Sequence, residues 1–226
     1  MSSSSESKRL RPSGGYRNLR SFQVATIVYD ATVNFCERFI DKRSRTVDQM
    51  VQAARSGRQN IAEGSRASAV SSQTELRLVN VARASLDELL LDYEDFLRQR
   101  GHEPWTKEHP RAREVRAVGM SSKAELPDSI NRTFPVDAAK YAPWLQHNDP
   151  SIVANAIICL IHQTNYLLDR QIAGLERQFI QEGGYTERLA AARVAELRLN
   201  QTDEPAVIQG PTCPLCGRAM VVRTAR

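Results

Sequence analysis

The stretch QMVQAARSGRQNIAEGSRAS, residues 49–68, decides the fold of this 226-residue chain. Its apolar residues recur every three or four positions, which is the period of an α-helix with one buried side. Thr46 followed by Gln49 resembles a capping box, so we expect the helix to begin near Thr46. The residues of the expected apolar side are Val47, Met50, Ala54 and Ile61.

The same period recurs in four other segments, which predicts helices at residues 19–39, 72–100, 150–182 and 186–199. Ser72 with Glu75 resembles a second capping box, and Asp149-Pro150 is typical of a helix start. Gly101 and Gly183 are the expected stops. In the first of these helices the expected apolar stripe is Phe22, Ala25, Tyr29, Val33, Cys36 and Ile40.

These helices predict an all-α fold. Short connections favour antiparallel neighbours, so we expect an up-down four-helix bundle spanning residues 17–182. Residues 102–148 contain five prolines and form a long insertion between the third and fourth helices. The insertion is either a decoration with its own task or a disordered excursion. Short helices are expected within it near 111–118 and 136–141.

The two ends of the chain lie outside the expected bundle. Residues 1–16 are polar and basic and are expected to form a disordered arm. The helix expected at 186–199 belongs to a suffix segment over 183–200, which a linker and a tail over 201–226 follow. No apolar run approaches the ~20 residues of a membrane span. Without a secretion signal, we expect a cytoplasmic protein with no membrane partner.

The chain shows none of the sequence patterns of common active sites. Its four histidines are scattered, and HExxH, GxSxG and glycine-rich phosphate loops are missing from the sequence. Cys36 and Cys159 fall within apolar helical patterns and are expected to be ordinary core residues. We therefore expect a protein that is not an enzyme.

Basic residues concentrate around the helix at 49–68. The chain has a net charge of +5, and residues 41–70 hold six basic and three acidic side chains. Arginine suits phosphate groups because its planar fork donates two parallel hydrogen bonds. The pattern predicts contact with DNA or RNA phosphates at low sequence selectivity, and a merely solvated surface is the alternative. The candidate residues are Lys42, Arg43, Arg45, Arg55, Arg58 and Arg66.

Two glycines lie one heptad apart on the same helix. Glycine within a helix costs roughly 1 kcal/mol relative to alanine, so Gly57 and Gly64 suggest that another backbone comes close. Ala53 lies one turn before Gly57 on the same side. Either tight packing inside one chain or a contact between subunits explains the three small residues.

Residues 59–64, QNIAEG, followed by Arg66, resemble the signature of four-helix-bundle proteins encoded within insertions of ribosomal RNA genes. That family also includes the accessory variability protein of diversity-generating retroelements. Residues 75–91, ELRLVNVARASLDELLL, resemble the third helix of the family. The resemblance covers about residues 17–100 and 150–182. It implies a homopentameric barrel whose basic surface binds nucleic acid and, for the retroelement members, a reverse transcriptase partner.

The C-terminal tail resembles a subset of that family with a suffix to the four-helix bundle. Residues 213–226, CPLCGRAMVVRTAR, are similar to the first half of a topoisomerase-type zinc ribbon. Cys213 and Cys216 would supply two of the four ligands that tetrahedral zinc requires. We expect this half-site to be empty and no cofactor to be bound, unless the natural chain continues past Arg226 with a second cysteine pair.

Two hypotheses of function follow from the sequence. The first is a non-enzymatic, nucleic-acid-binding accessory protein that serves a mobile element or its reverse transcriptase. The alternative is a structural oligomer that recruits a protein partner through the insertion and the tail.

Overall fold

The computed structural model describes residues 15–69, 71–121, 138–202 and 213–217, and within these ranges the regular structure is helical throughout. The all-α prediction is confirmed. The chain divides after Gly184 into two compact units, of which the second begins with α7. The elements are η1 Gly15–Asn18, α1 Arg20–Phe39, α2 Arg45–Ala67, α3 Ser72–Gln99, α4 Pro110–Ser121, η2 Ala138–Tyr141, α5 Ala142–Leu145, α6 Pro150–Glu182 and α7 Tyr185–Thr202.

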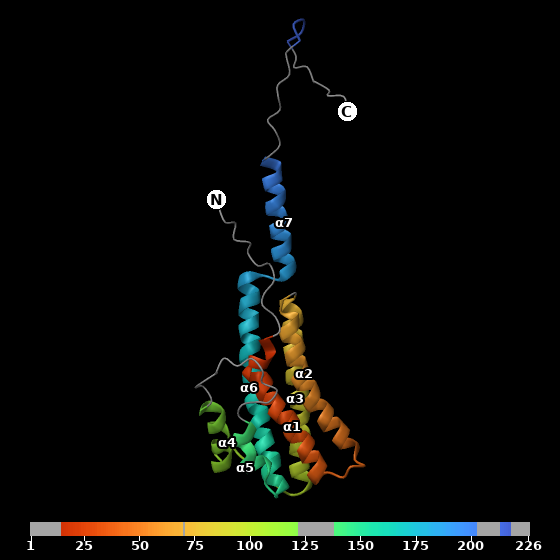
Figure 1. The fold of residues 1–226 in the computed structure, drawn as a ribbon, viewed down its shortest axis with the longest axis vertical. Helices are drawn as coiled ribbons and strands as arrows, with labels where there is room; N and C mark the ends of the chain where they lie inside the picture. Colours follow the sequence, from red (N-terminus) through yellow and green to blue (C-terminus); the bar gives the residue numbers. More distant parts are fainter. Residues whose placement is uncertain (1–14, 70, 122–137, 203–212, 218–226) are drawn as a thin grey trace. The chain divides into compact units, whose positions relative to one another are not determined.

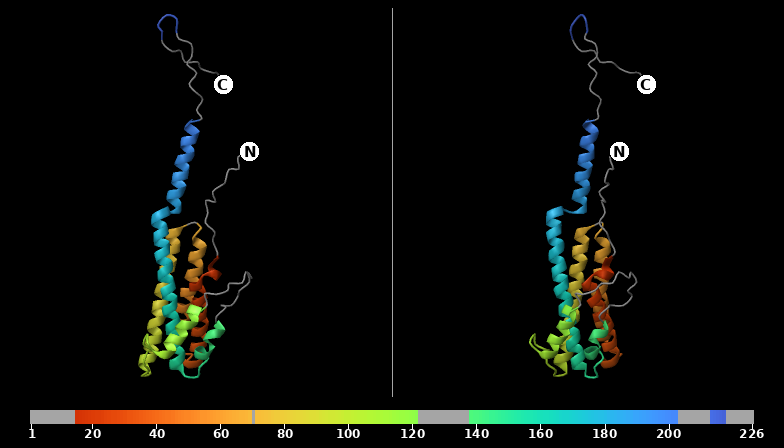
Figure 2. Two further views of the ribbon diagram at one scale, coloured as in Figure 1. Left: turned by 90° about the vertical axis from the view of Figure 1, so that its left-hand side faces the viewer. Right: turned by 60° about the vertical axis from the view of Figure 1, so that its left-hand side comes forward.

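Four long helices enclose the core of the first unit (Figure 1). α1 packs against α2 and α6, and α3 packs against the same two helices. Two views from other sides show α1, α2, α3 and α6 running alongside one another (Figure 2). The largest side chains that are fully buried between them include Phe35, Met50, Leu86, Tyr93 and Ile157.

The helix ends follow local capping chemistry. Ser44 accepts a hydrogen bond from the Thr46 N–H at 3.3 Å, and Ser71 accepts one from the Thr74 N–H at 3.1 Å. The capping boxes predicted at Thr46 and Ser72 are therefore wrong, because the serine that precedes each helix satisfies its first N–H groups. α2 begins at Arg45, one residue before its predicted start, and α3 begins at Ser72 as predicted.

The start of α6 and two helix ends are confirmed. Asp149 caps α6 at 2.8 Å from the Ser151 N–H, with Pro150 in the first turn as predicted. Gly101 and Gly183 follow α3 and α6 with φ near +70°, a conformation that glycine adopts without strain.

The first half of α6 is buried on every side. All ten residues from Ile152 to Ile161 are buried. A helix that is apolar all round must be covered all round. α1 and α3 cover part of this stretch, and α4 and α5 cover more of it. α6 is long and apolar enough to cross a membrane, but 72% of its most apolar window is buried in the protein.

The described part of the insertion is core structure. Ala112, Val115 and Tyr141 are each 1% exposed. Asn155 of α6 accepts a hydrogen bond from the Trp105 N–H at 2.6 Å and donates one to the Glu103 carbonyl at 3.3 Å. The described part of the insertion therefore covers α6 as a layer of the fold.

The two helices expected in the insertion have different outcomes. The one near 111–118 is confirmed as α4. The one expected at 136–141 is found as the 3-10 helix η2 at Ala138–Tyr141, which α5 follows directly, and residues 122–137 lie outside the described ranges.

The boundary of the N-terminal arm was predicted too late. Gly15 and Tyr16 were expected in a disordered arm, but they belong to η1, and Tyr16 is only 7% exposed. Its ring packs edge-on against Phe22, with 4.8 Å between the ring centroids. Burial of this aromatic ring outweighs the polar composition around it. Residues 1–14 lie outside the described ranges.

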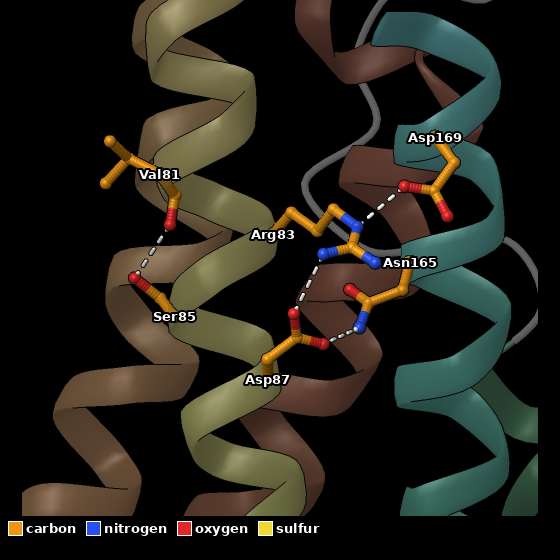
Figure 3. Close-up of polar contacts among 6 residues, drawn as sticks. All are labelled: Val81, Arg83, Ser85, Asp87, Asn165 and Asp169. Atoms are coloured by element: carbon orange, nitrogen blue, oxygen red, sulfur yellow. Dashed lines mark hydrogen bonds and ion pairs between the residues drawn. The ribbon is translucent and has the colours of Figure 1, made fainter.

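A polar network joins α3 to α6 (Figure 3). Arg83 donates from Nε to Asp169 at 2.6 Å and from Nη1 to Asp87 at 3.0 Å. Asn165, which is 8% exposed, donates to the second oxygen of Asp87 at 2.7 Å. The hydrogen bond to Asp169 is the main cause that raises the pKa of Arg83. Because each partner constrains the next, the network sets the register between the two helices.

The most extensive helix contact is that between α2 and α3, and glycine makes it possible. A Cβ atom at Gly57 would lie 2.8 Å from Cγ of the fully buried Leu86. At Gly64 the corresponding nearest atom is the Glu75 carbonyl oxygen at 3.4 Å, an ordinary van der Waals distance. Ala53 is buried on the same helix. Both glycines therefore face α3 of their own chain, which supports packing inside one chain over contact between subunits.

The two glycines should respond differently to alanine. Gly57→Ala is expected to lower the free energy of unfolding by about 1–3 kcal/mol, because overpacking outweighs the gain in helix propensity. Gly64→Ala is the matched control. It is expected to be neutral or to stabilise by up to about 1 kcal/mol, since nothing must move. Urea denaturation measures both, and equal effects of the two substitutions would contradict this packing.

Candidate nucleic-acid interface

Three of the candidate basic residues lie where α1 passes into α2. Lys42 and Arg43 are in the connection, Arg45 is the first residue of α2, and all three are exposed. The Asp41 carboxylate accepts a hydrogen bond from the Arg43 N–H at 2.9 Å and so shapes this turn. The turn presents three cations to solvent at one end of α2.

Arg55 and Arg58 lie near the middle of α2 in different surroundings. Arg55 is exposed, as the helical period predicts. Arg58 is half-buried, and its guanidinium lies 4.3 Å from the centroid of the Tyr29 ring on α1. Burial raises the pKa of the neighbouring Asp30, and the charge of Arg58 partly opposes that rise. A cation above an aromatic ring is held in place by the ring's negative face.

Arg66 lies near the end of α2 against η1. Its guanidinium lies 5.1 Å from the centroid of the Tyr16 ring, and its Nη2 donates to the Tyr16 hydroxyl at 3.3 Å. Arg17 lies on the same ring at 4.9 Å. Two arginines from distant parts of the sequence therefore share one tyrosine.

Three residues at this surface were not among the sequence candidates, namely Tyr16, Arg17 and Tyr29. Within residues 49–68 no aromatic residue accompanies the arginines. The structure brings Tyr16 and Tyr29 to Arg66 and Arg58 from η1 and α1. Sequence spacing carries no signal for such a contact, because the partners lie 29 and 50 positions apart. We call Arg17, Arg55, Arg58 and Arg66, with the turn at 42–45, the basic surface.

An acidic groove lies beside the basic surface. A cavity of about 1010 Å³ between α1, α2 and α3 is lined by Glu37, Asp48, Glu88 and Asp92, among other residues. Burial raises the pKa of Asp92, and Asp95 and Glu88 add to the rise. Apolar side chains from α1 and α2, including Val33 and Val51, form part of the lining. Phosphates would be repelled here, so the groove bounds any path of a nucleic acid over this unit.

The cysteine pair forms a tight turn in the second unit. The Gly217 N–H donates to the Cys213 carbonyl at 2.9 Å, and Gly217 has a φ of +69°. Backbone N–H groups of Leu215 and Cys216 donate to the Cys213 sulfur and lower the pKa of its thiol. Two thiols in one turn fit half of a tetrahedral zinc site. Within the described part of the chain no group of three or more potential ligands forms.

The other two cysteines are in the core as predicted. Cys36 is 2% exposed and Cys159 is 8% exposed. Burial raises the pKa of each thiol to about 11. The four thiols of the chain thus fall into two classes of access, since Cys36 and Cys159 are buried whereas Cys213 and Cys216 are not.

Comparisons with known proteins do not assign a family or a function to this chain. No protein-family model matches the chain, and the searches of curated proteins and of solved structures find no match.

Alkylation of the native chain should separate the two thiol classes. At pH 8 a thiol with a pKa of about 11 is thiolate in only about one molecule in a thousand, and burial blocks access as well. Iodoacetamide is therefore expected to modify Cys213 and Cys216 and to leave Cys36 and Cys159 intact. Peptide mass spectrometry measures this. Rapid alkylation of the Cys36 thiol without unfolding would contradict the described core.

Proposed function

We propose that this chain is a non-enzymatic, nucleic-acid-binding protein of the cytoplasm that contacts phosphates of DNA or RNA through its basic surface. The observation that carries the proposal is the ordering of Arg58 and Arg66 on tyrosine rings beside the exposed Arg55. An arginine already held in place loses less side-chain entropy when it meets a phosphate. Contacts to phosphates position a nucleic acid and carry little sequence information, so low selectivity is expected.

The architecture that we propose is the antiparallel, up-down four-helix bundle. The connections of residues 40–44 and 68–71 support it, because short loops place consecutive helices side by side in opposite directions. The resemblance in residues 59–66 and 75–91 further favours a homopentameric barrel and a polymerase partner such as a reverse transcriptase. Since Gly57 and Gly64 face α3, the proposed assembly rests on that resemblance and not on the glycines.

The basic surface is tested by its salt dependence. Arg55→Gln with Arg66→Gln is expected to weaken binding to unrelated DNA and RNA alike. Each phosphate that the variant no longer neutralises should flatten the slope of log K against log salt by about 0.9 on duplex DNA and by about 0.7 on single strands. Titrations between low and moderate salt measure the slope. An assembly of several copies would multiply the phosphates neutralised and steepen the parent's slope.

The matched control is Arg111→Gln with Arg113→Gln. Both residues are exposed on α4, which contacts α6, and the charge change is the same. This variant should bind as the parent does. Thermal unfolding checks that removing the interaction between Arg66 and Tyr16, worth about 0.5–1 kcal/mol, leaves the fold intact. If both double variants bind nucleic acid with the same affinity and salt slope, the basic surface makes no contact with phosphates and is merely exposed to solvent.

The proposed assembly has its own measurement. Light scattering coupled to gel filtration is expected to give about five times the 25.4 kDa mass of one chain. A single-chain mass at micromolar concentration would refute the assembly and leave the basic surface to be judged by its salt slope.

A structural scaffold that recruits a protein is the second candidate function. The acidic groove favours it, because four carboxylates above apolar side chains suit a basic amphipathic helix better than a nucleic acid. If the Arg55→Gln with Arg66→Gln variant binds nucleic acid as tightly as the parent, the scaffold becomes the better candidate.

A further inference from the structure

A second cavity lies away from the basic surface. It has a volume of about 770 Å³ and is enclosed by α4, residues 105–107 and α6. This size is typical of pockets that hold a small molecule or one unit of a polymer. α2 contributes no residue to its lining, so the inference drawn from it stands independently of the function proposed above.

Part of the wall is apolar and held rigidly. Ala112 and Ile158 are almost fully buried, and Trp105 and Leu167 complete this part. The Trp105 ring stacks on His109 with centroids 5.0 Å apart and planes 3° from parallel. Its backbone N–H is anchored on Asn155. The tryptophan is thus fixed before any ligand arrives.

The described residues contribute three cationic side chains to the wall. Lys107, Arg116 and Arg170 line the cavity, and among the residues that the structure describes no aspartate or glutamate does. Arg116 donates a hydrogen bond to the Lys107 backbone carbonyl, which holds its guanidinium against the 105–107 segment of the wall. Arg170 donates to the Tyr166 hydroxyl at 3.5 Å. Three cations around a partly enclosed space favour an anionic ligand.

An unsatisfied amide faces the same space. Gln163 lines the cavity, and its buried Oε1 atom has no hydrogen-bond partner within the described part of the chain. Gly119 of α4 lies against this amide so closely that any side chain there would displace it. A carboxamide offers an acceptor and donors side by side, the arrangement that pairs with the edge of a nucleobase.

We propose that the cavity between α4 and α6 binds one nucleotide unit, with its base against the apolar wall and its phosphate among the cations. A simple aliphatic acid fits these features less well, since it would leave Gln163 without a donor. A nucleotide offers a flat ring, a hydrogen-bonding edge and an anion in one molecule. The unit comes either from a free nucleotide or from a single strand.

Isothermal titration calorimetry of the full chain with adenosine monophosphate tests the proposal. Arg170→Gln and Gln163→Met are each expected to lower the affinity about tenfold by removing one polar contact. Arg177→Gln is the matched control, because Arg177 is exposed on the same helix outside the cavity and should leave the affinity unchanged. Adenosine and inorganic phosphate alone should each bind more weakly than the nucleotide.

Two comparisons complete the experiment. Displacement of the nucleotide by a single-stranded pentanucleotide assigns the cavity to a strand, and binding without displacement assigns it to the free nucleotide. Decanoate is the competitor that distinguishes an aliphatic acid. The proposal is overturned if adenosine monophosphate does not bind at millimolar concentration, if Arg170→Gln behaves like Arg177→Gln, or if decanoate displaces the nucleotide at equal concentration.

Discussion

The burial of residues 152–161 on every side of α6 is the constraint on which the rest of the first unit depends. An apolar helix surface without cover would cost about 25 cal/mol for each Å² left in water. α1 and α3 can cover only part of a cylinder, so a further layer must come from elsewhere. The described part of residues 102–148 supplies it, held by Asn155 and by the buried side chains of Ala112, Val115 and Tyr141. The described part of this connection therefore contributes to the core alongside the long helices.

Periodicity predicted the helices well and their buried sides unevenly. On α2 the expected residues Met50, Ala54 and Ile61 are fully buried. On α1 the expected Phe22, Tyr29 and Val33 are only half-buried, because α1 faces both α2 and α6 and its buried sector is centred between them. An apolar stripe that assumes one neighbouring helix leaves out the residues that face the second neighbour. The covering role of the described part of the insertion was beyond prediction for a related reason, since α4 and α5 meet α6 only through tertiary contacts.

Part of the candidate site could likewise be predicted from the sequence, and part could not. The exposure of Arg55 follows from helical spacing, and the cations before α2 follow from composition. The aromatic partners of Arg58 and Arg66 could not be predicted from spacing or composition. Tyr29 and Tyr16 are brought to these arginines by the packing of α1 and η1 on α2. The acidic groove and the cavity beside α6 likewise draw on several elements. Sequence locates charges along one helix, and only the fold decides which charges and rings share a space.

The close fit of Leu86 against Gly57 also bears on the order in which the chain folds. α2 and α3 are consecutive and joined by residues 68–71, so their contact closes a short loop and forms at low entropic cost. α6 must reach α3 across the connection of residues 100–149. Contacts near in sequence form fast and distant ones form slowly. We infer that α2 and α3 pair early and that α6 docks later, onto a template that already exists. A substitution at Leu86 would slow folding, whereas one at Ile157 would chiefly speed unfolding.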